Sequence, residues 1–421
     1  MKRVGKKLIV CALGLLLIAL ATPAEAEYFV FNLGTLAGDS STAIAINDHG
    51  EIVGNCINSN GQEHAFYYRE GMMRSLSAQF SAASAINESG EIAGSLRSYT
   101  TNIFTNIVVN PFTNIIIIPN PPTNSGPRLS IIPVNEAEAT FSTQALGGLL
   151  PITNGQVVTN LVINSQPAIF HLGAAPNVFE GAGNSGFAAG VNEQGQIVGG
   201  VTWLNSVIQY SFVYQKGATT DLPALGSTGE PGAATAINNR GEIVGFSGFQ
   251  PERCFLYSHG LIQDLGNFGG TESAPTAIND AGEIVGYSTT VSNVEMRAFL
   301  YSEGRMIDLG GLPGVHPSPF TNSAYGDQIQ LTSHATAINN WGEIVGSALA
   351  ANGATHAFLY SRGAMTDLND LVRLTHTNGP PGFLTLISAN GINDWGQIVG
   401  VGSYWDGKHE SGRAFLVDWF P

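Results

Sequence analysis

One phrase recurs seven times in this chain and constrains its fold more than any other feature. In its fullest form it reads Ala-Ile-Asn-x-x-Gly-Glu-Ile-Val-Gly, and the seven copies are anchored at Asn47, Asn87, Asn192, Asn238, Asn279, Asn339 and Asn393. Four of the successive spacings, at 40, 46, 41 and 54 residues, are close to the length of one supersecondary unit. Repeats of this period indicate an array of similar modules rather than a compact enzyme domain.

A second phrase follows the first along the chain. Its clearest copy is His-Ala-Phe-Leu-Tyr at 356–360, followed by Asp-Leu at 367–368, and related copies lie at 211–214, 254–257 and 298–301. Short runs rich in β-branched and aromatic residues, separated by Gly and Asn, are typical of strands joined by tight turns. Helical periodicity is absent, so each unit is predicted to hold four short strands.

The Asn-x-x-Gly segment is predicted to form the hairpin turn between the first two strands of each unit. Asparagine can bond its own backbone, and glycine can adopt the positive φ that such a loop requires. We therefore interpret the seven asparagines as structural, together with the seven turn glycines, Gly50, Gly90, Gly195, Gly241, Gly282, Gly342 and Gly396. The next residue is Glu in five copies and Gln in two, Gln196 and Gln397, which argues against a catalytic carboxylate. A calcium loop would need more alternating oxygen ligands.

A four-stranded unit of about 40 to 45 residues has the size of a β-propeller blade. Residues 29–34 match the last strand of a unit, and residues 413–417 match the strand before it. We therefore predict an all-β propeller whose ring is closed by pairing of the N- and C-terminal strands, which removes exposed edges. About seven blades are expected. Eight is the alternative, because 105 residues separate Asn87 from Asn192, with a poor echo of the first phrase at 152–158 and a fair echo of the second at 167–170.

These phrases resemble the bacterial extracellular HAF repeat family, which is named for the His-Ala-Phe present here at 64–66 and 356–358. The resemblance covers nearly the whole chain after the leader, with departures between Leu96 and Ala188. It implies an exported repeat protein and supplies no catalytic residues.

The first 26 residues have the pattern of a secretory signal peptide. Four basic residues among the first seven precede an apolar run from Leu8 to Leu20 and then Ala24-Glu25-Ala26. An apolar run of this length is too short to span a bilayer, for which about 20 residues are needed. We therefore expect cleavage after Ala26, leaving residues 27–421 as a single propeller domain that is secreted, extracellular or periplasmic, with no membrane insertion.

Composition disfavours nucleic acid as a partner. Without the leader, 13 basic and 31 acidic residues remain, which corresponds to a net charge of −18 with histidine neutral. Nucleic-acid affinity depends on basic residues that neutralise phosphates. The two remaining cysteines, Cys56 and Cys254, are several units apart and are expected to be buried thiols rather than a disulfide.

The repeats are interrupted by an uncharged stretch at 98–127 that is rich in Asn, Thr, Ile and Pro. Its Ile-rich arms, on either side of Asn110-Pro111, could pair as a hairpin that packs on its own blade, or could offer a contact surface for a partner. Two further insertions, at 311–333 and 369–388, are either linkers or functional loops.

The residue before the turn glycine varies from copy to copy and should face solvent, and in the last two copies it is Trp341 and Trp395. Two exposed indoles on adjacent blades could form a platform on which a sugar ring stacks, or could pack beneath the neighbouring insertions. These two residues are the candidate ligand-binding residues. His64 and His356 belong to the strand phrase, and we interpret them as structural.

No motif for a hydrolase, esterase, metal centre or cofactor is present in the sequence. Two hypotheses follow. The first is an exported, non-catalytic binding or scaffolding propeller for a glycan or extracellular protein. The second is a carbohydrate-active hydrolase or lyase, in which two carboxylates from different blades would face each other at one mouth of the channel.

Overall fold

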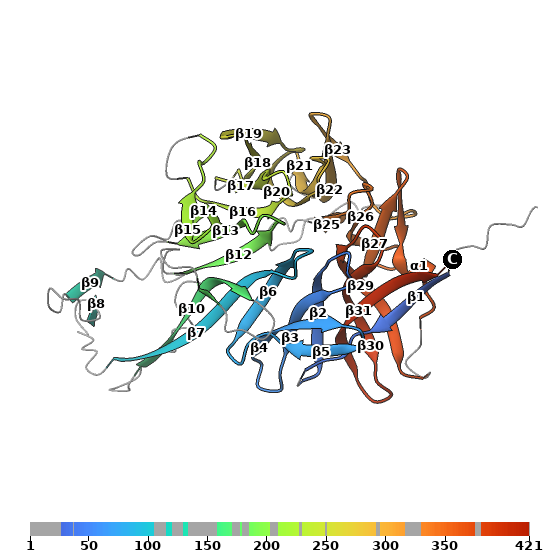
Figure 1. Ribbon diagram of the computed structural model, residues 1–421, viewed down its shortest axis with the longest axis horizontal. Helices are drawn as coiled ribbons and strands as arrows, with labels where there is room; N and C mark the ends of the chain where they lie inside the picture. The colour runs from blue at the N-terminus through green and yellow to red at the C-terminus, as the bar shows by residue number, and fades with distance from the viewer. Residues whose placement is uncertain are drawn as a thin grey trace, which may run out of the picture.

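The computed structural model describes residues 27–36, 38–104, 115–119, 129–133, 158–170, 177–178, 185–202, 209–226, 230–248, 251–291, 295–315, 330–374 and 380–420. Seven antiparallel sheets, each with a four-stranded path, are arranged in a ring as the blades of a β-propeller (Figure 1). The predicted fold class is therefore confirmed, with seven blades. The signal peptide predicted at 1–26 lies outside the described residues.

The blades follow chain order. Blade 1 is β2(Ser40–Ile46), β3(Ile52–Ile57), β4(Glu63–Arg69) and β5(Met72–Ser75), and blade 2 is β6(Ser81–Ile86), β7(Ile92–Phe104), β10(Val158–Phe170) and β11(Asn177–Val178). Blade 3 is β12(Ser185–Val191), β13(Ile197–Thr202), β14(Gln209–Gln215) and β15(Ala218–Asp221), and blade 4 is β16(Gly232–Ile237), β17(Ile243–Ser247), β18(Arg253–Ser258) and β19(Leu261–Gly266).

Blade 5 is β20(Gly269–Ile278), β21(Ile284–Thr290), β22(Glu295–Ser302) and β23(Arg305–Asp308), with β24(Gln330–Leu331) added in parallel to β22. Blade 6 is β25(Ser333–Ile338), β26(Ile344–Leu349), β27(Thr355–Ser361) and β28(Ala364–Asp367), followed by the four-residue helix α1(Leu368–Leu371). Blade 7 is β29(Gly382–Ile392), β30(Ile398–Trp405), β31(Glu410–Phe420) and, at its outer edge, β1(Glu27–Asn32). None of the helices in the described part of the chain has the length and apolar character needed to cross a membrane.

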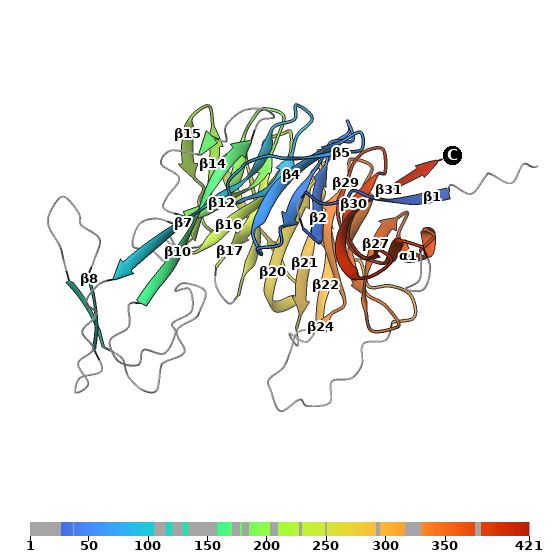
Figure 2. The same cartoon turned by 90° about the horizontal axis from the view of Figure 1, so that it is seen from below.

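The N-terminal strand closes the ring as predicted. β1 pairs antiparallel with β31 over six residues, from Glu27 opposite Phe420 to Asn32 opposite Phe415. Figures 1 and 2 show the two strands side by side, with the first strand in blue and the last in red. Blade 7 therefore combines three strands from the end of the described chain with one strand from its beginning.

One fully buried phenylalanine lies in the third strand of every blade. These residues are Phe66, Phe170, Phe212, Phe255, Phe299, Phe358 and Phe415. The ring of Phe66 packs over Gly54, the last residue of the Ile-Val-Gly phrase, where an added Cβ would lie 2.7 Å from the ring. The final glycine of that phrase therefore makes room for the aromatic core of its own blade.

Blade 2 accounts for the long gap between repeats. Residues 167–170, the fair echo of the second phrase, end β10, and Phe170 is buried there. The eighth blade considered as an alternative is therefore not required. The poor echo at 152–158 lies outside the described residues except for Val158, which begins β10.

The uncharged stretch differs in part from expectation. Residues 98–104 continue β7, which pairs with β10 along a pair of long strands that extend beyond the ring (Figure 2). Ile115–Pro119, as β8, pairs with β9(Leu129–Pro133), itself an apolar run. The other Ile-rich arm, at 105–109, and the Asn110-Pro111 turn lie outside the described residues, so the hairpin between the two arms stays a prediction.

Candidate functional site

Each Asn-x-x-Gly turn is held by its asparagine side chain, as blade 5 illustrates. Asn279 Oδ1 accepts hydrogen bonds from the Ala281 and Glu283 amides at 3.1 and 2.9 Å. Gly282 has φ +86° and donates its amide to Asn279 O at 3.0 Å. All seven turn glycines have positive φ, between 67° and 86°. The structural role predicted for these asparagines and glycines is confirmed.

The same asparagines also join the blades to one another, which the sequence did not predict. Each Nδ2 donates to the backbone oxygen of the equivalent asparagine in the next blade, at 2.9 to 3.1 Å. Asn393 in blade 7 donates to Asn47 O in blade 1, so these bonds form a closed inner belt. Because all seven side chains are buried, their polar atoms depend on these partners.

A second belt surrounds the mouth of the channel. It is formed by the residue after each turn asparagine, Asp48, Glu88, Glu193, Asn239, Asp280, Asn340 and Asp394. Each side chain accepts the backbone amide of the equivalent residue in the preceding blade, at 2.6 to 3.0 Å, and Asp394 donates to Asp48 to close the circle. Together these residues line a polar cavity of about 230 Å³.

This outer belt brings carboxylates from five blades to one mouth, the arrangement expected of the enzyme alternative. However, both oxygens of Asp280 accept bonds from Asn239, and both oxygens of Asp394 accept bonds from Asn340. Burial raises the pKa of Glu88, whose two oxygens contact the Asp48 amide. The carboxylates are thus occupied as acceptors that hold the ring together.

The glutamate that follows the turn glycine in five blades is also structural, as blade 1 illustrates. Glu51 Oε2 accepts from Asn47 Nδ2 at 2.8 Å, while Oε1 accepts from the Tyr67 hydroxyl at 2.7 Å and Arg69 Nη1 at 2.8 Å. Burial acts to raise the pKa of Glu51, but the hydrogen bonds from Tyr67 and Asn47 and the charge of Arg69 outweigh it and lower the pKa. The glutamate therefore fixes its own turn to the third strand of the blade.

Trp341 and Trp395 face solvent as predicted. Trp341, in the turn between β25 and β26, is 76% exposed, and Trp395, between β29 and β30, is 66% exposed. Each indole crosses a blade boundary, since Trp341 Nε1 donates to Asp394 O at 2.9 Å and Trp395 Nε1 donates to Asp48 O at 3.0 Å. The alternative, in which these indoles are buried beneath the neighbouring insertions, is wrong.

A groove of about 340 Å³ brings the two tryptophans together between blades 6 and 7. We call it the tryptophan groove, and its lining residues are Tyr28, Trp341, Glu343, Leu359, Ile392, Asp394, Trp395, Gly396 and Trp419. Two carboxylates thus lie among four aromatic side chains. Burial and the neighbouring charge of Glu343 raise the pKa of the Tyr28 hydroxyl, which therefore stays protonated at neutral pH.

Sequence reasoning missed Tyr28 and Trp419 as parts of this groove. Tyr28 lies on β1 and Trp419 lies opposite it on β31, so only the closure of the ring brings them to blade 6. Trp419 Nε1 donates to Trp395 O at 2.8 Å, and it lies 3.3 Å from the position that a Cβ on Gly396 would take. The predicted pairing of the N- and C-terminal strands could have identified these two residues, because it places both of them on blade 7.

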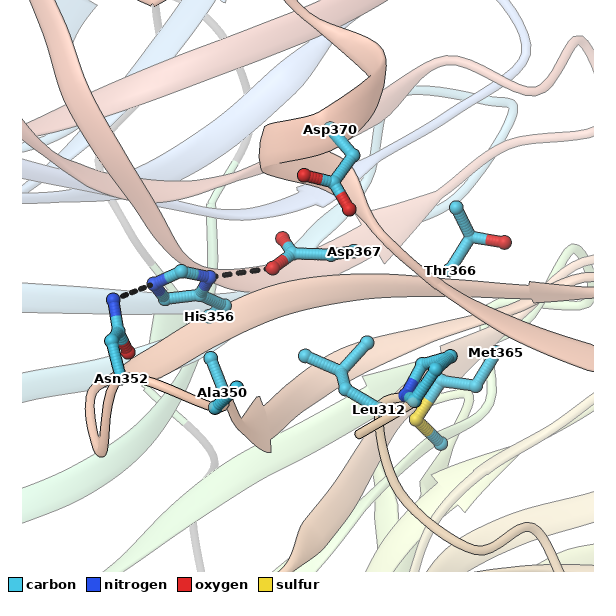
Figure 3. A pocket seen from close by; sticks show the side chains of 10 residues that line it. Leu312, Ala350, Asn352, His356, Met365, Thr366, Asp367 and Asp370 are labelled. Carbon is cyan, nitrogen blue, oxygen red and sulfur yellow. Dashed lines mark hydrogen bonds and ion pairs between the residues drawn. The ribbon is translucent and has the colours of Figure 1, made fainter. Parts of the chain in front are cut away.

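A second pocket, of about 400 Å³, lies at the edge of blade 6 (Figure 3). His356 Nδ1 is bonded to Asp367 Oδ2 at 2.6 Å, and His356 Nε2 lies 3.4 Å from Asn352 Nδ2. Leu312 and Met365 line the pocket as apolar residues, and Asp370, from α1, lines it as well. The interpretation of His356 as purely structural overlooked this cavity.

Comparison with known proteins supplies a partial family match. Residues 263–418 match the model of a family described as Protein of unknown function (DUF3466). No curated protein matches the chain.

Solved structures resemble the chain only distantly. A puromycin-hydrolyzing peptidase from Mycobacterium tuberculosis is 12% identical, with 88% of this chain and 61% of that protein covered and a TM-score of 0.37. A structure from a study of two prolyl endopeptidases is 8% identical, with 89% and 50% covered and a TM-score of 0.41. The Aleuria aurantia lectin is 12% identical, with 81% and 94% covered and a TM-score of 0.29. The chain thus spans about half to three fifths of the length of the two peptidases.

Proposed function

We propose that the protein is an exported, non-catalytic propeller that binds a glycan in the tryptophan groove. The observation that supports this proposal is the combination of two exposed indoles and two carboxylates around one groove of about 340 Å³. Aromatic faces stack on the apolar faces of sugar rings, while carboxylate oxygens accept hydrogen bonds from sugar hydroxyls. The exposed indole faces offer the first contact. Each oxygen of Glu343 and Asp394 already accepts one bond from a protein donor and keeps a second lone pair for the other contact.

The indoles are held in place before any ligand arrives. Hydrogen bonds from the ring nitrogens of Trp341, Trp395 and Trp419 to backbone oxygens restrict their orientation. A side chain that is already ordered loses less conformational entropy on binding, so such a platform favours affinity. The acidic groove also suits a neutral or cationic glycan better than a sulfated or uronic one.

The hydrolase alternative has less support. A general acid needs an oxygen that can carry a proton toward the substrate, whereas the paired carboxylates of the outer belt accept bonds from neighbouring blades. Five acids from different blades do lie at one mouth of the channel, as that hypothesis requires. Their hydrogen bonds, however, join neighbouring blades.

Export is part of the proposal and rests on the leader pattern at 1–26 and on the resemblance to the HAF repeat family. Fusion of residues 1–40 to a reporter that is active only outside the cytoplasm tests it directly. The reporter should be active and should lose activity when Leu15→Arg interrupts the apolar run.

A glycan array tests the binding function. Residues 27–421 should bind a defined set of glycans, and the double variant Trp341→Ala/Trp395→Ala should lose that binding. The matched control is Leu261→Ala/Val291→Ala, which removes two exposed apolar side chains, 74% and 80% exposed, from blades 4 and 5. The control should bind as the parent does.

Two outcomes would reject the groove as a glycan site. One is an array without binding by the parent chain, and the other is binding that the tryptophan double variant retains. In the first case, a protein partner at the stretch 98–127 becomes the preferred hypothesis, and in the second the glycan site lies elsewhere on the chain.

A further inference from the structure

In blade 4, an arginine fills the corner where the third and fourth strands meet the loop before the blade. Arg253, two residues before the core Phe255, reaches from β18 into this corner. Its Nη1 lies 3.4 Å from Asp264 Oδ2, and its Nη2 donates to Leu225 O at 3.2 Å and lies 3.4 Å from Glu230 Oε2. A guanidinium group therefore occupies the corner and contacts carboxylates.

Blade 5 repeats this arrangement with its own arginine. Arg297, again two residues before the core phenylalanine, contacts Asp308 Oδ2 at 2.9 Å and Glu295 Oε2 at 2.6 Å. Two neighbouring blades thus place a guanidinium group at equivalent positions, beside the aspartate of the Asp-Leu phrase.

Blade 6 keeps the aspartate and lacks the arginine. His356 takes the arginine position, because it precedes Phe358 by two residues and Phe358 pairs with Asp367. Leu312 follows Asp308 by four residues, as Leu225 follows Asp221, so it corresponds to the loop leucine of blade 4. A cavity of about 400 Å³ lies in this corner, bordered by Leu312, His356 and Asp367.

The cavity has the groups that an arginine side chain needs. Asp370 is exposed and has no hydrogen-bond or ion-pair partner among the described residues, and Figure 3 shows its carboxylate directed toward Asp367. Leu312, Pro313 and Met365 offer apolar surface for an aliphatic stem. Asp367 is fixed by His356 at Oδ2 and by the Asn369 amide at Oδ1. Blade 1 also has a histidine here, but Ser75 replaces the aspartate and Phe80 packs on His64.

We propose that this corner of blade 6 binds an arginine side chain supplied from outside the chain, in place of the arginine that blades 4 and 5 supply from within. The guanidinium group lies against Asp370 and Asp367, and its stem lies on Leu312 and Met365. The planar fork of a guanidinium group matches carboxylates better than an ammonium group does. This site is separate from the tryptophan groove and does not depend on glycan binding.

Calorimetric titration with Nα-acetyl-L-arginine methylamide tests the proposal. The probe should bind residues 27–421, and the neutral isostere Nα-acetyl-L-citrulline methylamide should bind at least about tenfold more weakly, as expected when a charge-assisted bond is lost. A second titration, with free L-arginine, shows whether the bound arginine belongs to a protein partner or is the free amino acid. Equal affinity indicates that the side chain alone is recognised, as for a protein partner, and higher affinity indicates the free amino acid.

Two variants locate the site. Asp370→Asn should lower the affinity for the arginine probe by about threefold or more, an effect kept modest because this carboxylate is exposed. His356→Arg places in blade 6 the residue that fills the corner of blades 4 and 5, so it should abolish binding while the urea midpoint of unfolding shows that the fold is kept. Failure of the parent chain to bind the arginine probe at millimolar concentration would overturn the proposal, as would unchanged binding by both variants.

Discussion

Replacement of one inner-belt asparagine should destabilise the propeller severely. Asn279 is 4% exposed and makes four hydrogen bonds: two accepted within its turn, one donated to Glu283 Oε2 at 2.8 Å and one donated to Asn339 O at 3.1 Å. A neutral intramolecular bond contributes about 1 kcal/mol net and one to a charged group about 2 kcal/mol. Asn279→Ala should therefore lower the free energy of unfolding by about 5 kcal/mol.

Urea unfolding followed by tryptophan fluorescence measures this loss. Asn239→Ala is the control, because Asn239 belongs to the outer belt and its bonds to Glu193 and Asp280 are exposed. Exposed interactions contribute little, so the control should lose under about 1 kcal/mol. If Asn279→Ala also lost less than about 1 kcal/mol, or if the two variants were equal, the inner belt would not be a main source of stability.

Three further predictions concern the core, the turns and the thiols. Phe299→Ala should cost about 3 to 5 kcal/mol in urea unfolding, because the ring is fully buried; an unchanged midpoint would contradict the blade core. The lowered pKa of Glu51 implies a contribution to stability that is present above the unfolded-state pKa, about 4.3, and is lost as pH falls through the folded-state pKa. Glu51→Gln, which copies Gln397, should therefore show a smaller loss of unfolding free energy between pH 5 and pH 3, and equal acid sensitivity would refute the assignment. Cys254 is buried, and burial raises its pKa to about 12, so neither it nor the buried Cys56 should react with iodoacetamide at pH 8 until the chain is unfolded; rapid native labelling would contradict their burial.

The fold could be predicted because its determinants are local and repeated. The turn bonds that Asn279 accepts and the positive φ of Gly282 arise within one blade, and the same chemistry returns in every copy of the phrase. Closure of the ring could also be predicted, since residues 29–34 and 413–417 complete one unit. Because the phrase is repeated, each of these predictions could be made from several copies in the same chain.

The inter-blade contacts could not be predicted in the same way. The partner of Asn87 Nδ2 is the backbone of Asn192, 105 residues away, and its identity depends on the register of one blade against the next. Tyr28 and Trp419 join the tryptophan groove for a similar reason, because their places depend on how blade 7 packs against blade 6. Sequence periodicity describes one blade and contains no information on that packing.

Function should lie where the repeats differ, because the shared residues are occupied in holding the ring. The repeated phrase of this chain uses its asparagines, glycines and acids in turns and belts, which leaves them few free atoms for a ligand. Both candidate sites arise from departures in blades 6 and 7, where tryptophan replaces the variable turn residue and His356 replaces an arginine. A variant such as His356→Arg, or Trp341→Ala, which introduces the residue that another blade has at the same position, should therefore remove binding while leaving the fold unchanged, which separates function from architecture in a single variant.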